Sequence, residues 1–343
     1  MSTTAAVVVY GATGHTGQFV VAELRARGIA TIVSGRDAGR LELLAAGWGD
    51  VEVRPATVDD PAALDRALAG AAAVINCAGP FAVTAGPLVE AALRAGIAYV
   101  DVAAEIEANL STFAEHAEAA EAAGTPVLPA MAFYGGLGDL LVTAALGGAT
   151  TADEVHVAYG LSSWHPTAGT REAGAVSHER RGGRRLRYAD GALRHHDDPL
   201  VRQDWHFPEP LGRRAVLAEF TMADVVTVPS HLTVSEVRTY MTVEAATDLA
   251  GPDTPAPAPV DEHGRSDQTF VVDVLVRSGG VERRASARGQ DIYAVTAPLA
   301  VEAVERILTG RTRATGVASA GAMFEAADFL RSLAPHISVE LPD

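Results

Sequence analysis

The sequence has 343 residues, 48% of them hydrophobic, and its formal net charge is −16. This length is enough for two domains with an apolar core, and the acidic balance excludes a protein that wraps nucleic acid, which needs clustered cations. A single cysteine, Cys77, excludes an intramolecular disulfide and disfavours a cysteine-based metal site, and the absence of lysine excludes Schiff-base chemistry.

Membrane and targeting signals are the next features to consider. No apolar run approaches the roughly 20 residues of a membrane helix. The segment 1–4 lacks the basic residues that open a signal peptide. We therefore expect a soluble, cytoplasmic protein.

The first predicted elements are a strand over 5–10 and a helix over 18–27, joined by the glycine-rich turn 11–17. In a strand–turn–helix, such glycines give a tight turn, let the backbone approach a pyrophosphate and let the helix pack closely on the strand. Phosphates then bind at the helix N-terminus. The turn predicts a dinucleotide site made by Gly11, Thr13, Gly14, His15, Thr16 and Gly17. The alternative is a glycine-rich turn without a ligand.

The second predicted strand ends at Ser34, and Arg36 follows it. NAD-selective sites usually carry an acidic residue here that bonds the ribose 2′-hydroxyl, whereas a guanidinium suits a 2′-phosphate. Asp37 is a natural N-cap for the next helix. We therefore expect NADP(H) to be preferred over NAD(H), with Ser34 and Arg36 at this end. An exposed Arg36 paired with Asp37 is the alternative.

Strands and helices continue to alternate up to residue 128, which predicts a doubly wound parallel sheet. Asp59 follows the third strand, near the expected adenine, and helix capping explains it equally well. The fourth strand ends at Asn76, and the loop after it faces the cofactor crevice in such a sheet. Asn76, Ala78, Gly79 and Pro80 are the expected neighbours of the nicotinamide ribose.

These motifs together resemble the saccharopine dehydrogenase-like NAD(P)-binding oxidoreductases, a group with trans-acting enoyl reductases and saccharopine reductase-like enzymes. The resemblance covers about the first 140 residues and is carried by 10–17, 34–36, 76–81 and 98–105. It implies an NAD(P)-binding domain with an inserted α/β domain that carries specificity and often dimer contacts. Relatives commonly have tyrosine or phenylalanine where His15 stands. The run 132–139 lacks the acidic and serine residues that many relatives have near its start, so chemistry that depends on them is not carried over.

The second half predicts an inserted α+β domain with a mostly antiparallel sheet. A helix is expected over 138–146, a loop over 162–171, and strands over 154–159, 221–228, 236–243, 269–277 and 281–288, the last two forming a hairpin. Helices over 296–308 and 322–333 follow. We expect the Rossmann domain to comprise 1–135 with C-terminal helices from about 310–343, and the substrate and dimerisation domain to comprise 136–309.

A reductase needs a proton donor near the nicotinamide. His165 is the first choice and Tyr134, which follows strand six, is the second. Arg171 is a hypothetical carboxylate ligand. Phe81 and Trp164 complete the predicted substrate site. For each choice the alternative is a structural role.

For two further clusters of charged residues the sequence predicts neither a metal site nor a catalytic role. The stretch 195–198, with two histidines and two aspartates, is interpreted as a solvated loop, and no metal site is predicted. The basic run 180–185 could steer an anionic or thioester-carried substrate, but a solvated turn is the favoured interpretation.

The preferred function is an NADP(H)-dependent oxidoreductase that reduces a C=C, C=N or C=O bond of a small metabolite by hydride transfer. The main alternative is a non-catalytic NADP(H)-binding sensor or scaffold, and a third is an isomerase or epimerase with tightly held NAD. The expected partner is a small-molecule substrate, with neither nucleic acid nor membrane, and a homodimer is plausible.

Overall fold

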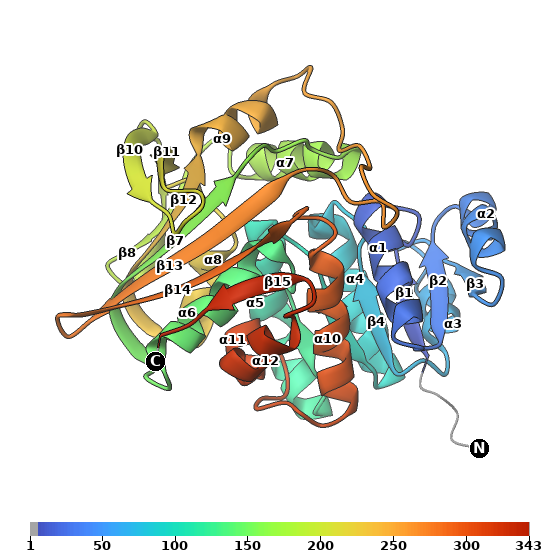
Figure 1. The fold of residues 1–343 in the computed structure, drawn as a ribbon. Helices are drawn as coiled ribbons and strands as arrows, with labels where there is room; N and C mark the ends of the chain where they lie inside the picture. The colour runs from blue at the N-terminus through green and yellow to red at the C-terminus, as the bar shows by residue number, and fades with distance from the viewer. Residues whose placement is uncertain (1–5, 343) are drawn as a thin grey trace.

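The computed structural model describes residues 6–342, which build two sheets joined by helices (Figure 1). The first sheet is parallel, in the order β3-β2-β1-β4-β5-β6. Its strands are β1 (Val7–Tyr10), β2 (Thr31–Gly35), β3 (Glu52–Pro55), β4 (Ala73–Asn76), β5 (Ala98–Asp101) and β6 (Val127–Leu128). The order reverses between β1 and β4, as in a doubly wound nucleotide-binding fold. The predicted first strand began at Ala5, which lies outside the described residues.

Helices cover both faces of this sheet. They are α1 (His15–Ala26), α2 (Ala38–Trp48), α3 (Pro61–Leu68), α4 (Phe81–Ala95), α5 (Ile106–Ala123) and, from the C-terminal part, α10 (Thr296–Leu308). Val7 and Val9 of β1 share one apolar cluster with α1 and α10, whereas Val8 and Tyr10 share another with α3 and α4. Alternate side chains of a strand point to opposite faces, so a strand covered on both faces is apolar throughout.

The second sheet has nine strands and is mostly antiparallel, as predicted. Its main path is β10-β11-β12-β7-β13-β14-β15, in which β12 and β7 run parallel, and β8 links β9 to β12. The strands are β7 (Thr151–Leu161), β8 (Arg185–Ala189), β9 (Ala192–His196), β10 (Val201–His206), β11 (Arg213–Ala218), β12 (Thr233–Thr242), β13 (Thr269–Ser278), β14 (Val281–Gln290) and β15 (Ile337–Glu340).

Short helices connect and cover this sheet. They are α6 (Gly138–Leu146), α7 (Ala168–Arg180), α8 (Asp224–Thr227), α9 (Val243–Ala250), α11 (Ala320–Met323) and α12 (Ala326–Ser332), with a π-helical turn at Phe133–Leu137 and a 3-10 turn at Val228–Ser230. Helix α6 packs against β13 and β14, and α11 and α12 pack against α6. None of the helices in the described part combines the length and the apolar character that a membrane span requires.

Four local predictions were wrong, and for one of them a long-range contact accounts for the difference. The segment 221–228 is helical rather than extended, since Asp224 is buried beside β7 and accepts a hydrogen bond from the Tyr159 hydroxyl at 2.7 Å. The predicted loop 162–171 ends early because Thr167 caps α7 through the Thr170 N–H. The histidines of 195–198 lie in β9, and the expected helix 322–333 is split into α11 and α12.

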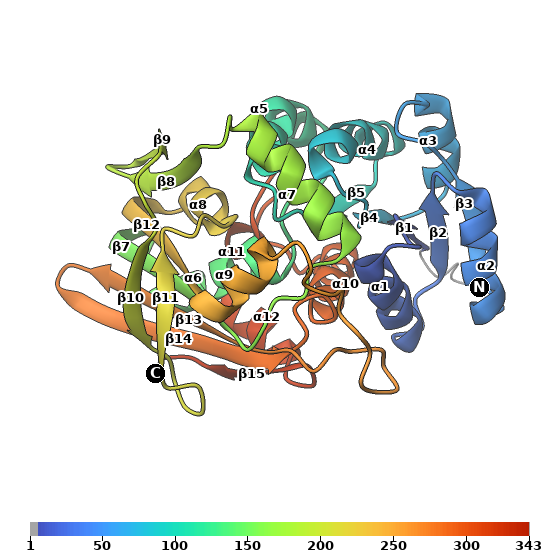
Figure 2. The same ribbon diagram turned by 90° about the horizontal axis from the view of Figure 1, so that it is seen from above.

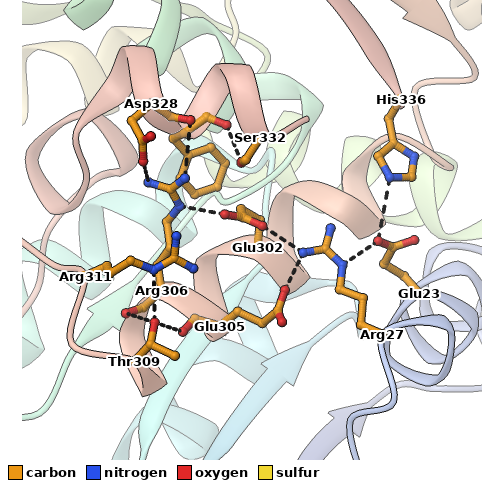
Figure 3. A network of polar contacts seen from close by, with 11 residues as sticks. Glu23, Arg27, Glu302, Glu305, Arg306, Thr309, Arg311, Asp328, Ser332 and His336 are labelled. Atoms are coloured by element: carbon orange, nitrogen blue, oxygen red, sulfur yellow. Dashed lines mark hydrogen bonds and ion pairs between the residues drawn. The ribbon is translucent and has the colours of Figure 1, made fainter. Parts of the chain in front are cut away.

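An ion-pair network fastens the C-terminal part to the first helix (Figure 3). Arg27, directly after α1, contacts Glu23 of that helix at 2.7 Å and Glu302 of α10 at 2.8 Å. Glu302 also pairs with Arg306 at 2.7 Å, and Arg306 reaches Asp328 of α12 at 2.7 Å. The C-terminal segment thus divides its contacts: α10 and this network hold α1, whereas β15 joins the second sheet.

Candidate active site

The glycine-rich turn has the geometry of an anion site. Gly11 has φ +81°, and a Cβ added there would lie 2.8 Å from Ala78. A Cβ on Gly17 would lie 2.3 Å from the Gly11 carbonyl oxygen, so side chains are excluded at both positions. No side chain caps α1, which begins directly after Gly14. Its first N–H groups are therefore available to a ligand's phosphates, and the residues present fit a dinucleotide.

Two guanidinium groups lie on the segment that follows β2. Arg36 is exposed directly after this strand, and Asp37 caps α2 by accepting from the Arg40 N–H at 3.0 Å. Arg40 lines the cavity described below and its Nη2 donates to the Thr13 carbonyl at 3.3 Å. Sequence reasoning missed Arg40, although its position one helical turn after Arg36 was a usable signal. Both side chains are available to a ribose phosphate.

Ser34 and Asp59 were also predicted to bind the cofactor, but neither lines the cavity described below. Ser34 is buried and its hydroxyl donates to the Arg54 carbonyl at 2.7 Å, while its own carbonyl accepts from the Gly11 N–H at 2.9 Å. Ser34 therefore shapes the turn. Asp59 is exposed after β3. Nearby hydrogen-bond donors, first the Thr57 hydroxyl, lower the pKa of Asp59.

The loop after β4 is organised by Asn76. Its amide donates to the hydroxyls of Thr84 and Tyr99, both at 3.2 Å, and its Oδ1 accepts from the Ala78 N–H at 3.0 Å. Asn76 is fully buried, so it positions the loop. Ala78, Gly79 and Phe81 line the cavity, and Pro80, which follows a cis peptide bond, does not.

Two buried carboxylates brace the adjoining loops. Asp101 accepts from the N–H groups of Ala103 and Ala130 at 3.0 and 2.8 Å, and burial raises its pKa to about 6. Glu105 accepts from the N–H groups of Phe81 and Ala82 at 2.8 and 3.0 Å. Glu105 thereby satisfies the first two N–H groups of α4, which begins at Phe81. Burial also raises the pKa of Glu105.

One cavity of about 560 Å³ joins the glycine-rich turn to the second unit. Helix α7 lies across this region, over α4 and α5 (Figure 2). Its cavity-facing residues are small: Gly169, Thr170, Ala173, Gly174 and Ser177. The rest of the lining includes apolar and aromatic residues, namely Phe81, Ile106, Phe133, Tyr134, Trp164, Leu249 and Tyr293. The cavity therefore has one end of backbone and guanidinium groups and another end of aromatic rings.

Tyr134 stands at the centre of the aromatic wall. Its ring stacks on Trp164 at 5.0 Å and meets Tyr159 edge-on at 4.9 Å. Its hydroxyl is buried and has no hydrogen-bond partner among the described residues. Burial raises the pKa of this phenol well above its usual value, so it stays protonated at neutral pH. Trp164 is itself fixed because its Nε1–H donates to the Tyr293 hydroxyl at 3.2 Å.

Two other predicted residues are placed outside the cavity lining. His165 is half-buried next to Trp164, and its carbonyl accepts from the Tyr293 hydroxyl at 3.3 Å. Arg171 donates to the carbonyls of Gly251 and Thr254 at 3.1 and 2.8 Å, so it holds the proline-rich loop. The roles first assigned to these two side chains find no support in their positions.

The basic run near α7 contributes one lining residue. Arg181 borders the cavity and faces Glu107 of α5 at 3.4 Å, and Arg180 donates to the Ala82 carbonyl at 3.1 Å. These contacts anchor the C-terminal end of α7 to the first unit. Arg180 is exposed but belongs to α7, whereas Arg181 begins the predicted turn and is half-buried.

The family model that describes the saccharopine dehydrogenase NADP-binding domain matches residues 7–128. The resemblance predicted from the motifs is thus confirmed, because the region 7–128 is similar to this class of nicotinamide dinucleotide-binding domains.

The relatives are saccharopine dehydrogenase-like oxidoreductases. The protein of Mus musculus is 31% identical over 37% of this chain and 34% of its own length, and that of Rattus norvegicus is 32% identical over 29% and 27%. The match spans about a third of these relatives' length. Saccharopine dehydrogenase (L-Glu forming) from Saccharomyces cerevisiae aligns with 99% of this chain and 100% of the solved chain, with a TM-score of 0.66 and 13% identity. At that identity the alignment shows a shared fold.

Proposed function

We propose that this protein is an NADP(H)-dependent oxidoreductase that reduces a C=C, C=N or C=O bond of a small, largely apolar metabolite. The observation that carries the proposal is the single cavity that joins the glycine-rich turn to the aromatic wall around Tyr134. When bound, NADPH supplies a hydride to the acceptor. The matching domain model and the oxidoreductase relatives support this class of reaction.

Different residues of the chain would bind the different parts of the cofactor. The N–H groups at the N-terminus of α1 would hold the phosphates. Arg36 and Arg40 favour a ribose 2′-phosphate, which is the basis for preferring NADPH over NADH. Loops fixed by Asn76 and Glu105 shape the floor beneath the nicotinamide.

Tyr134 is the proposed proton donor. Its O–H group is buried beside the cavity and lacks an acceptor, and an oxygen or nitrogen atom of a bound acceptor molecule would provide one. The high pKa keeps the proton on the phenol until charge develops on the acceptor. Trp164 holds the ring in place by stacking, and α7 contributes part of the cavity wall.

The test is a titration of the purified protein with NADPH and with NADH, followed by NADPH oxidation in the presence of imine, enoyl and carbonyl acceptors. We expect tighter binding of NADPH, weakened by Arg36→Ala, and acceptor-dependent oxidation with at least one class. Tight binding without turnover of any acceptor would favour a sensor or scaffold. Failure of the folded protein to bind either nucleotide would reject the proposal.

A further inference from the structure

His15 occupies an unusual place for an ionisable residue. It is the first residue of α1, directly after Gly14, and it lines the cavity. Its ring is packed edge-on between Phe19 and Tyr293, with centroids 5.2 Å away in both cases. The Nε2 atom is buried and has no hydrogen-bond partner among the described residues. An imidazole is thus built into the wall that receives the phosphates.

The groups around His15 make its protonation state sensitive to a ligand. Burial lowers the pKa of His15, and the Asp291 carboxylate opposes this only in part. Asp291 is itself occupied, since its Oδ1 accepts from the N–H groups of Tyr293 and Ala294 and its Oδ2 from that of Ser266. The positive end of the α1 dipole also disfavours a charged imidazole.

Other ionisable neighbours reinforce the neutral form. Tyr293 is uncharged at neutral pH because burial raises the pKa of its phenol. Arg40 brings a positive charge to the same turn through its contact with the Thr13 carbonyl. Without a ligand, His15 is therefore neutral near neutral pH.

We propose that His15 takes up a proton from solvent when the diphosphate of the dinucleotide binds, so that it acts as an ionisable cofactor-binding residue. The inference rests on the proposed cofactor site. A diphosphate held at the N-terminus of α1 would adjoin His15, which is the first residue of that helix and lines the cavity, and its negative charges would favour the imidazolium form. Binding and protonation are then linked: cofactor affinity is highest at low pH and falls as pH rises through the pKa of the bound state.

The experiment is calorimetric titration of the full-length protein with NADPH in buffers of different ionisation enthalpy. The dependence of the observed heat on the buffer gives the protons taken up per site. His15→Phe keeps an aromatic ring between Phe19 and Tyr293 but cannot titrate, and His15→Gln keeps a polar, non-titrating side chain. The 2′-phosphate also titrates, with a pKa of about 6 by analogy with phosphate monoesters, so the difference between wild type and variant isolates His15.

We expect proton uptake by the wild type that exceeds the uptake by both variants. The ratio of wild-type to His15→Phe affinity should fall about tenfold between about pH 6 and about pH 8, since one unit of pKa shift corresponds to a factor of ten. Equal proton uptake in wild type and both variants would overturn the inference and leave the cofactor site intact. Absence of NADPH binding by the wild type would instead refute the proposed function.

Discussion

The two ends of the cavity are built in different ways. At the nucleotide end, the recognition groups are backbone N–H groups at the start of α1 and the turn Gly11–Gly17 that exposes them. At the other end, recognition depends on side chains such as Tyr134 and Trp164, which come from separate segments, while Tyr293 contacts both His15 and Trp164. The first end suits any ligand with the same diphosphate, whereas the second decides which acceptor reacts. Changes at the two ends should therefore separate cofactor binding from turnover.

The largest effect is expected at Gly17. A Cβ at this position would overlap the Gly11 carbonyl at 2.3 Å, so Gly17→Val must displace the turn from the phosphates. We expect complete loss of measurable NADPH binding, checked by fluorescence titration. Gly47→Ala in exposed α2 is the matched control, because nothing lies within 4 Å of its added Cβ; it should bind normally and be slightly more stable. Normal NADPH binding by Gly17→Val would contradict the assignment of the turn.

A large effect on turnover alone is expected for Tyr134→Phe. Loss of the proton donor should lower kcat by about 10²–10⁴-fold, with NADPH affinity unchanged because the ring still stacks on Trp164. Steady-state kinetics with an accepted substrate provide the measurement. Tyr188→Phe removes a hydroxyl that bonds the exposed Gly191 carbonyl and serves as control. If Tyr134→Phe retains wild-type kcat, another group donates the proton.

The third prediction concerns the ion-pair network that joins the C-terminal part to α1. The side chains of Arg306 and Glu302 are only 3% and 7% exposed. Arg306→Met therefore leaves the buried Glu302 carboxylate with one positively charged partner fewer. The free energy of unfolding should fall by about 3–5 kcal/mol, measured by urea denaturation. Arg94→Ala breaks the exposed pair with Asp65 and should cost less than about 1 kcal/mol. Similar losses in both variants would refute the importance of burial here.

The smallest effect is expected for Arg40→Ala. Loss of one charge-assisted bond to a 2′-phosphate costs about 1.5–3 kcal/mol, or about 10- to 100-fold in NADPH affinity. NADH lacks that phosphate, so its affinity should change little, and parallel titrations reveal the difference. Arg66→Ala, with a side chain 72% exposed on α3, should alter neither. An equal loss for both nucleotides would place Arg40 at the diphosphate rather than at the ribose.

The difference between a site made by consecutive residues and one made by distant segments also explains what could be predicted from the sequence. The glycine-rich turn and the order of β1 to β6 follow from local spacing, because βα units record their geometry in consecutive residues. Tyr134 was placed correctly beside the cavity since it follows β6. The position of Arg171 could not be predicted, because its partners, the carbonyls of Gly251 and Thr254, are 80 or more residues away.

For two other features, the start of α4 and helix α7, the hydrophobic pattern of the segment gave no indication. The start of α4 depends on a cap from Glu105, which lies 24 residues beyond Phe81. Helix α7 buries little apolar surface, with Ser177 its buried residue, so hydrophobic periodicity could not reveal it. The contribution of α7 to the cavity wall could therefore not be predicted from its hydrophobic pattern.

The proposed function requires that nicotinamide and substrate share the cavity that α7 lines. The chain has three tryptophans, of which Trp164 lines this cavity while Trp48 ends α2 and Trp205 lies on β10. The most direct test is energy transfer to bound NADPH in a variant that retains only Trp164, compared with Trp164→Phe. We predict stronger transfer per tryptophan from Trp164 than from the other two. Weaker transfer from Trp164 would contradict the claim, because the nicotinamide would then lie away from the aromatic wall.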